Sequence, residues 1–464
     1  MLNVAIDPRN PTGARQRVRA QRGALSPQAR VLIVAKDDRL AGPLCDGLDR
    51  LGWRTVTARG PNGALAAIED LGIEAVAIDV AGMDSEADAH ALARRLRSAG
   101  APRQLPVIAL GRTAEPGGFD LAMAPPVHAA QAALRLEQLV RAAVAEEEVE
   151  LRAATFAEQG RHLEPPEVSR GAYRVLTIGE PAPRFLALAN ALGERGAETV
   201  AAFTSFTAFD YLHERPFDAV VLWAGESTTE SLSITAGMRR NTRLFHVPAV
   251  LVLGQGSDLA MSEAFHRGVS DLAAADEQPE HVAARILELA RAHRRAAGIR
   301  QALERARGSG LMDAATGLFT PDLFAAHLVR LASAARERHR PLTVSVLRVA
   351  DSPEIAAARA SGWLDRALPQ IGSMMGRLVR VEDTAARLGP ELFALALPGT
   401  SQAASRPAAD RIAAVIGCTA FDAGPQRKPF VVEFDIGVAE LVAGETAVHA
   451  LERAAGRAQS VRAS

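Results

Sequence analysis

The sequence has few of the residues that mark several common protein classes. Its 464 residues include two cysteines, Cys45 and Cys418, which are too few and too far apart for a disulfide framework or a metal site. Both are expected to be small core residues. No run of about 18 apolar residues is present, which argues against a membrane span. The net charge of -1 gives no reason to expect nucleic acid or an anionic membrane as a partner.

The N-terminal segment has no apolar stretch of the kind that secretory signals carry. Residues 1–28 are polar, contain Pro8, Pro11 and Pro27, and are predicted to be disordered. A cytoplasmic protein, without membrane insertion and without bound nucleic acid, is therefore the expectation. The length suggests about two to four domains of ordinary size.

Short apolar segments alternate with helical ones through the first two thirds of the chain. Strands are predicted at 30–34, 54–58, 74–80 and 106–110, and the pattern repeats with strands at 174–178, 217–222 and 247–253. This alternation predicts an α/β fold with doubly wound parallel sheets, and the repeat predicts two such domains. Helices are predicted at 128–150 and 279–307. The run Glu146 to Glu148 is interpreted as a solvated helix face.

A third α/β unit begins near Leu311. Its pattern predicts two strands that flank a hairpin centred on Gly389, together with helices on either side. The expected strands and helices lie at 321–338 (helix), 342–350 (strand), 362–380 (helix), 401–416 (helix) and 430–439 (strand).

The first repeat resembles response-regulator receiver domains. In that family an Asp at the carboxyl end of the third strand accepts a phosphoryl group, and Asp79 in Ala75-Val-Ala-Ile-Asp79 occupies this position. The acidic pair that holds Mg²⁺ in the family falls on Ala35 and Lys36, so the metal cradle is missing. Asp79 is a candidate phosphoacceptor, with a solvated loop carboxylate as the alternative.

The second repeat has Trp223 at the acceptor position, in Val220-Val-Leu-Trp223. Tryptophan cannot accept a phosphoryl group, so this unit is predicted to be a pseudo-receiver. Relatives of this kind usually serve as dimerisation or docking surfaces, and the resemblance therefore implies a homodimer.

The third unit carries three motifs in a fixed order. They are Asp313-Ala-Ala-Thr316-Gly317-Leu318, then Arg387-Leu-Gly389-Pro390-Glu391-Leu392-Phe393, and finally Ile436-Gly437-Val438-Ala439. Together they resemble the ordered motifs of the diguanylate cyclase (GGDEF) domain. The resemblance covers about 150 residues. A single motif would mean little, whereas the ordered set is specific.

Several positions of the cyclase pattern have changed. Pro390 replaces a glycine that lets the backbone approach phosphate, and Leu392 replaces an acid. Arg348 stands where the family has a metal-binding Asp, which reverses the charge. The cyclase positions, intact or degenerate, are Arg348, Ala356, Asp365, Gly389, Pro390, Glu391, Leu392 and Phe393. No catalytic residue set and no metal are therefore expected.

An R-x-x-D motif survives as Arg380 and Asp383, with five residues between Asp383 and the signature glycine Gly389. In the family this spacing marks an inhibitory site that binds cyclic di-GMP, and Arg411 matches the arginine that completes it. An arginine fork can pair with guanine or phosphate, and a carboxylate can accept from the guanine edge. Arg348 and Asp351 form a second R-x-x-D at the wrong spacing. The alternative for Arg380 and Asp383 is an exposed ion pair of little energetic value.

These observations divide the chain into 1–28 (tail), 29–150 (receiver-like domain 1), 151–171 (linker), 172–297 (pseudo-receiver domain 2), 298–310 (linker) and 311–464 (degenerate GGDEF domain). The resemblance implies a non-catalytic cyclic di-GMP effector in bacterial signalling. It further implies a place in cell-cycle control, protein partners such as a proteolysis adaptor and a cell-cycle regulator, and a location at a cell pole. A scaffold that binds no nucleotide and a residual GTP-binding cyclase are the alternatives.

Overall fold

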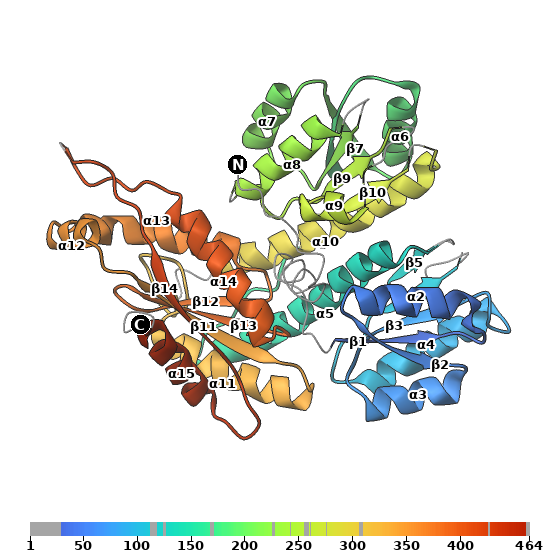
Figure 1. Cartoon of the computed structure of the whole chain (residues 1–464), viewed down its shortest axis with the longest axis horizontal. Helices are drawn as coiled ribbons and strands as arrows, with labels where there is room; N and C mark the ends of the chain where they lie inside the picture. Colours follow the sequence, from blue (N-terminus) through green and yellow to red (C-terminus); the bar gives the residue numbers. More distant parts are fainter. Residues whose placement is uncertain are drawn as a thin grey trace, which may run out of the picture. The chain divides into compact units, whose positions relative to one another are not determined.

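The computed structural model describes most of the chain, and Figure 1 shows its ribbon. The described residues are 29–111, 118–123, 127–167, 171–224, 228–241, 243–254, 259, 261–274, 276–305, 310–425 and 427–460. The tail at 1–28 lies outside them, so its predicted disorder stays a prediction. The structure divides into two compact units, one formed by 1–163 with 307–464 and the other by 164–306.

The first domain is a five-stranded parallel sheet with the strand order β2-β1-β3-β4-β5. This is the order of doubly wound folds that bind ligands at the carboxyl edge of the sheet. Its central strands are buried because helices cover both faces. The strands are β1 (Arg30–Val34), β2 (Arg54–Ala58), β3 (Ile73–Asp79), β4 (Val107–Leu110) and β5 (Leu121–Met123).

The helices of this domain form a layer on each side of the sheet. Helices α2 (Asp38–Arg50) and α5 (Ala129–Glu158) pack on one face, and α3 (Pro61–Asp70) and α4 (Glu86–Gly100) on the other. Two helix starts follow from local sequence. The side chain of Asp37 accepts a hydrogen bond from the Arg39 amide (3.0 Å), and that of Ser85 accepts from the Asp88 amide (3.1 Å).

The second domain repeats this sheet, with β7-β6-β8-β9-β10 as the equivalent order. The prediction of two doubly wound parallel sheets is therefore confirmed, and both are compatible with receiver-like domains. The strands are β6 (Tyr173–Ile178), β7 (Ala197–Ala202), β8 (Ala219–Trp223), β9 (Ala249–Val252) and β10 (Asp271–Ala273). The helices are α6 (Pro183–Glu194), α7 (Ser205–Glu214), α8 (Thr229–Arg240), α9 (Met261–His266) and α10 (Pro279–Arg305).

The third domain has an antiparallel sheet with the order β12-β13-β11-β14. Helices α12, α13 and α14 enclose the main core on one face, and α15 packs on the other. The strands are β11 (Leu342–Val349), β12 (Thr384–Gly389), β13 (Leu392–Pro398) and β14 (Phe434–Glu440). The helices are α11 (Pro321–Glu337), α12 (Pro353–Ala360), α13 (Trp363–Leu378), α14 (Gln402–Gly417) and α15 (Ala447–Ser460).

Two motif positions of the third domain have structural explanations. A Cβ at Gly437 would lie 1.9 Å from the carbonyl oxygen of Ala454, so this glycine lets α15 approach the sheet closely. In the opening motif, Asp313 Oδ1 accepts hydrogen bonds from the amide (2.8 Å) and the hydroxyl (2.6 Å) of Thr316. Gly317 follows with a φ of 70°, which a side chain would strain. These contacts close a tight turn before α11.

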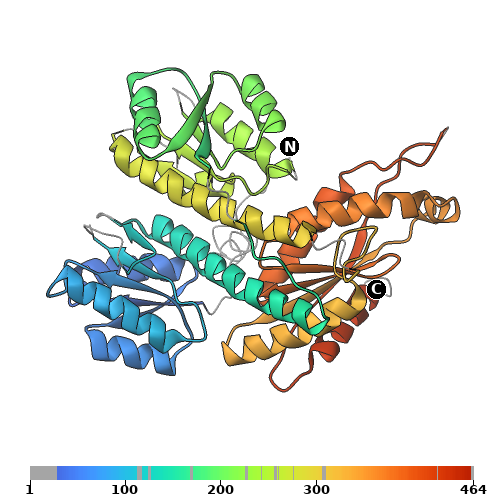
Figure 2. The ribbon, with the colours of Figure 1, turned by 180° about the vertical axis from the view of Figure 1, so that it is seen from behind.

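Two predicted domain boundaries are wrong, because each falls inside a continuous helix. Helix α5 passes the predicted end of domain 1 at residue 150 and continues to Glu158, and α10 passes residue 297 and continues to Arg305. Figure 2 shows α5 leaving the first sheet and reaching the third domain, where it packs against α11. Much of each predicted linker is therefore helical, and helix α5 belongs to both domains of its unit.

The structure also bears on what the sequence indicated about the two cysteines and about membrane spans. Cys418 is exposed, so its interpretation as a core residue is wrong, while Cys45 is half-buried. Among the described residues, no helix combines the length and the apolar character that crossing a membrane requires.

Candidate functional site

The signature hairpin is held by contacts from the third domain itself. Gly389, Pro390 and Glu391 form the tip between β12 and β13. Arg387 donates from Nε to the Gly389 carbonyl (3.2 Å) and from a terminal nitrogen to the Pro390 carbonyl (3.3 Å). The Val349 amide donates to the Glu391 carbonyl (3.0 Å), which joins the tip to β11. The backbone of the hairpin is thus fixed without any ligand.

The carboxylate of Glu391 is paired with Arg359 of α12. Arg359 donates from Nε to Oε1 (2.6 Å) and from a terminal nitrogen to Oε2 (2.7 Å), which is a bidentate pair. The same guanidinium reaches Asp351 Oδ1 at 2.7 Å. The hydrogen bonds that Arg359 donates to Glu391, and then to Asp351, raise the pKa of Arg359 above its usual value. The one acid left in the signature is therefore neutralised within the chain.

The residues around the hairpin do not fit the metal ions that a diguanylate cyclase would need. Arg348, at the position of a family metal ligand, lies on β11 opposite Leu392 and Asp435. A guanidinium at this place repels a divalent cation, and Leu392 offers no oxygen. Among the described residues, no cluster of three or more His, Cys, Asp or Glu has a metal-binding arrangement.

Of the three remaining cyclase positions, two lie on the surface of the third domain. Ala356 on α12 and Asp365 in the first turn of α13 are both exposed, whereas Phe393 is fully buried and belongs to the core. Phe393 therefore has a packing role. Ala356 has no group that can recognise a nucleotide, and Asp365 alone retains the chemistry of a nucleotide contact.

The R-x-x-D motif forms the turn between α13 and β12. The amide of Arg380 donates to Asp383 Oδ2 at 3.2 Å, so the carboxylate folds back over its own turn. Asp383 is 7% exposed, and Asp383 Oδ1 is buried with no hydrogen-bond partner among the residues that the structure describes. Burial, and then the neighbouring Glu382, raise the pKa of Asp383 to about 7. This motif is not the water-exposed ion pair considered as the alternative.

Two further arginines face this turn from different elements. Arg411 lies on α14 and Arg141 on α5 of the first domain. Burial, followed by the nearby positive charge of Arg380, lowers the pKa of both, to about 10 for Arg411. Glu137 pairs with Arg141 one turn earlier on α5. The structure thus collects three guanidinium groups around the carboxyl of Asp383, an arrangement suited to an anionic ligand with hydrogen-bond donors.

Arg141 was not predicted as a site residue, because the helix at 128–150 was assigned wholly to the first domain. A signal was present: Arg141, Glu148, Arg152 and Thr155 recur at spacings of seven, four and three, as one stripe along a helix. A polar stripe that runs beside an apolar stripe on one helix indicates a second face of that helix, which packs against polar side chains of another element.

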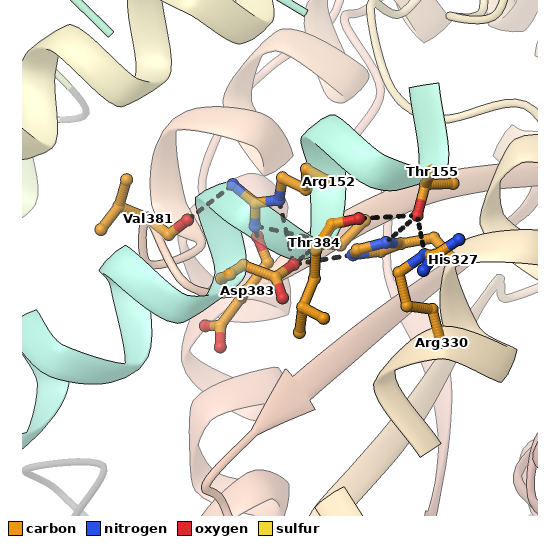
Figure 3. Close-up of polar contacts among 9 residues, drawn as sticks. Arg152, Thr155, His327, Arg330, Val381, Asp383 and Thr384 are labelled. Carbon is orange, nitrogen blue, oxygen red and sulfur yellow. Dashed lines mark hydrogen bonds and ion pairs between the residues drawn. The ribbon is translucent and has the colours of Figure 1, made fainter. Parts of the chain in front are cut away.

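Figure 3 shows the contacts of this stripe with the R-x-x-D turn. The guanidinium of Arg152 is 1% exposed and pairs with Glu148 at 3.0 Å. It donates to the carbonyls of Val381 (2.9 Å) and Asp383 (3.0 Å) and to the hydroxyl of Thr384 (3.1 Å). Helix α5 therefore contacts the backbone of the candidate ligand site directly.

The interpretation of Glu146 to Glu148 as a solvated helix face is wrong for two of its residues. Glu147 is 4% exposed and Glu148 1% exposed. Glu147 pairs with Arg340 at 2.6 Å, and Glu148 accepts from His327 at 2.7 Å. Charges this deeply buried persist because each one meets a partner from the third domain.

Asp79 lies where the receiver resemblance places it, at the carboxyl end of β3. It is 9% exposed and lines a hollow of about 250 Å³ together with Lys36, Arg59 and Arg95. Lys36, at the position of the family's acidic pair, binds Asp84 at 2.6 Å. Asp84 and Asp88 also line the hollow, so both cationic and acidic side chains surround Asp79 there.

The acceptor position of the second domain is filled by aromatic packing. Trp223 at the end of β8 lies 5.9 Å from the ring of Phe185, which in turn lies 6.3 Å from Phe203. A Cβ at Gly179 would lie 2.6 Å from the Cβ of Trp223, so the loop after β6 closes over this position. The indole of Trp223 offers no group that could accept a phosphoryl at this position.

Comparison with known families gives one direct match. Residues 310–463 match the family model described as "Diguanylate cyclase, GGDEF domain". The third domain is a GGDEF domain. The match begins at residue 310, one residue before Leu311, which is the start predicted from the motifs.

The curated relatives include the response regulator PleD of Caulobacter vibrioides, from strains NA1000 / CB15N and CB 15. Each is 23% identical over 240 residues, which cover 52% of this chain and 53% of PleD. The chain thus spans about half the length of the curated relatives it matches. The chain is similar to PleD over this part of its length, and its third domain to the GGDEF family.

Solved GGDEF structures are also similar to this chain. The GGDEF domain of DgcB from Caulobacter crescentus, in complex with c-di-GMP, is 22% identical with a TM-score of 0.31, and covers 33% of this chain and 89% of that chain. The FimX GGDEF domain from Pseudomonas aeruginosa has the same identity and TM-score, with coverages of 33% and 95%. The diguanylate cyclase SiaD from Pseudomonas aeruginosa, in complex with its activator SiaC, is 24% identical with a TM-score of 0.31 and coverages of 39% and 70%.

Proposed function

We propose that this chain is a non-catalytic cyclic di-GMP effector: a PopA-like protein, and a degenerate relative of the PleD cyclase. The observation that carries the proposal is a contrast between two places in one domain. At the signature hairpin, Arg359 neutralises Glu391, and Arg348 replaces a metal ligand. At the R-x-x-D turn, three arginines and one carboxyl remain around a buried site.

The chemistry of cyclic di-GMP suits the second place. Arg380, Arg411 and Arg141 offer forked donors for its phosphates and for guanine O6 and N7. Asp383, once ionised, accepts hydrogen bonds from a guanine edge. Because burial and mutual repulsion make the guanidinium groups costly to hold together, a ligand with two negative charges lowers their energy.

Two arginine variants test where the ligand binds. Arg380→Ala removes one fork and leaves Asp383 buried without its nearest positive charge, so affinity for cyclic di-GMP should fall at least tenfold. Arg348→Ala is the matched control. Arg348 is the first residue of the second R-x-x-D motif, and it lies on β11, away from the turn. This variant should leave the dissociation constant unchanged. Equal losses in both variants would contradict the assignment.

The enzyme alternative is tested by turnover of GTP. With Arg348 at a metal position and Glu391 held by Arg359, the full chain with GTP and Mg²⁺ should form no cyclic di-GMP detectable by chromatography. Asp365 and Glu391 are the remaining support for a GTP-binding regulator. Product formation above a protein-free control would favour that alternative, while absence of binding to either nucleotide would favour a scaffold.

The proposed biological setting rests on the resemblance to PopA-like effectors. It comprises a homodimer built on the receiver-like domains, a role in cell-cycle control, recruitment to a cell pole, and partners such as a proteolysis adaptor and a cell-cycle regulator. Sedimentation of the full chain with and without cyclic di-GMP tests the dimer. A monomer under both conditions would remove that part of the proposal.

A further inference from the structure

Helix α5 contributes to two hydrophobic cores. Residues of its first half, Ala132, Leu136 and Val140, are fully buried in the core of the first domain. In its second half, Phe156 is fully buried and its ring lies 5.9 Å from that of Phe319 in the third domain. A helix is stiff over this length, so a displacement of its first half moves its second half as well.

The second half of α5 contacts the R-x-x-D turn through one side chain. Arg152 donates to the carbonyls of Val381 and Asp383, on either side of Glu382, and to the hydroxyl of Thr384. These bonds fix the orientation of peptide groups within and directly after the motif. The direction in which Asp383 and Arg380 present their side chains follows from those peptide groups.

Arg152 is itself held in place by a buried network (Figure 3). Glu148 accepts from Arg152 Nε (3.0 Å), from His327 Nε2 (2.7 Å) and from the Thr384 hydroxyl (3.1 Å). His327 Nδ1 lies 3.0 Å from the hydroxyl of Thr155. Glu148, Arg152 and Thr155 come from α5, while His327 comes from α11 and Thr384 from β12. The network therefore joins α5 to the two elements beside the turn.

We propose that Arg152 is a positioning residue for the cyclic di-GMP site and that α5 couples this site to the first domain. The proposal rests on the proposed function. A movement of α5 would break the three hydrogen bonds from Arg152 to the turn and would weaken the binding of cyclic di-GMP. Because coupling is reciprocal, bound ligand must also hold α5 more firmly against the third domain.

Arg152→Lys tests the positioning role in the full chain. Lysine keeps the positive charge beside Glu148 but cannot reach three acceptors with a rigid fork. We expect the dissociation constant for cyclic di-GMP to rise about tenfold, a change of about 1.4 kcal/mol in binding free energy. Arg453→Lys is the matched control. Arg453 on α15 also makes three guanidinium hydrogen bonds, to Glu445 and to the carbonyl of Glu440, but none to the turn or to the Glu148 network, so this variant should leave the dissociation constant within about twofold of the unmutated chain.

Hydrogen–deuterium exchange of the unmutated chain gives a second readout that needs no variant. Saturating cyclic di-GMP should slow exchange in 144–158 of α5 as well as in 380–386. Three results distinguish a failure of the proposed function, of the coupling and of the positioning role. No binding by the unmutated chain overturns the proposed function and this inference with it. Binding without protection of 144–158 overturns the coupling alone. Equal affinities of the unmutated chain and folded Arg152→Lys overturn the positioning role.

Discussion

At Asp383, burial and charge act in opposite directions. Burial and Glu382 favour the neutral carboxyl, while Arg380 and Arg141 favour the carboxylate, and the resulting pKa is about 7. A guanine edge donates hydrogen bonds and therefore selects the carboxylate. Ligand binding should consequently release a proton near neutral pH, which makes the affinity depend on pH.

We expect cyclic di-GMP to bind about tenfold more weakly at pH 6 than at pH 8, because the carboxylate fraction rises about tenfold across this range. The measurement is the dissociation constant from pH 5.5 to pH 8.5. Asp383→Asn is the control, since an amide does not titrate; it should bind weakly with no pH dependence. A flat profile for the unmutated chain would contradict the carboxylate role.

The same residue links pH to stability. Its pKa in the folded state lies above the value of about 3.9 expected when unfolded, so the folded state holds the proton more tightly. Asp383 therefore costs stability progressively as the pH rises from about 4 through about 7. Asp383→Asn should raise the melting temperature at pH 8 and have a smaller effect at pH 5. A larger gain at pH 5 would be inconsistent with the raised pKa.

Arg359 is the residue whose removal most directly reopens the signature hairpin. Arg359→Ala frees the carboxylate of Glu391, but Arg348 would still repel a metal ion and Leu392 would still offer no ligand. We expect this variant to form no cyclic di-GMP from GTP with Mg²⁺ or Mn²⁺. Turnover after this single change would mean that the hairpin is autoinhibited and not degenerate.

At the scale of elements, α5 shows where sequence patterns fail. Six of the nine strands given bounds from the sequence agree with the structure within about one residue, because short apolar runs between turn residues have few alternatives. Strands β5, β7 and β10 were not predicted. The pattern could not show that Glu147 and Glu148 are buried, because their partners Arg340 and His327 lie far away in the sequence. A charged run is solvated unless a distant segment supplies its counter-charges.

The junction between α5 and α11 also makes a prediction about stability. Phe156 is fully buried and packs edge-on against Phe319, so Phe156→Ala removes packing in the third domain and leaves a cavity. We expect a loss of about 3–5 kcal/mol in unfolding free energy, seen as a lower denaturant midpoint. Phe206→Ala, at a side chain that is 76% exposed, is the control and should change it by about 0.5 kcal/mol or less. Similar effects from both variants would contradict the burial of α5.

At the scale of the whole molecule, the alternation of strands and helices predicted the two parallel sheets, but not which parts of the chain pack together. The first and third domains form one compact unit, although 143 residues separate them between Leu163 and Arg307. Glu147 and Glu74 of the first domain both bind Arg340 of the third, and α5 contacts the R-x-x-D turn. Contacts of this kind depend on which surfaces meet, and periodicity reports only which residues share a face.

Some residues of the candidate site could be predicted from the sequence, and others could not. Arg380, Asp383 and Arg411 follow from motif spacing, since the family pattern fixes their order along the chain. Arg141 and Arg152 belong to no motif and reach the turn only because α5 extends beyond its own domain. The site therefore combines a motif that can be predicted from sequence with a helix that only the three-dimensional structure places there.

Calorimetric titration of the full chain with cyclic di-GMP, after removal of any co-purified nucleotide, is the decisive test of the proposed ligand. We expect a dissociation constant in the micromolar range or below at pH 8, with weaker binding at pH 6. No heat of binding from a folded sample at either pH would contradict it and leave a scaffold that binds no nucleotide.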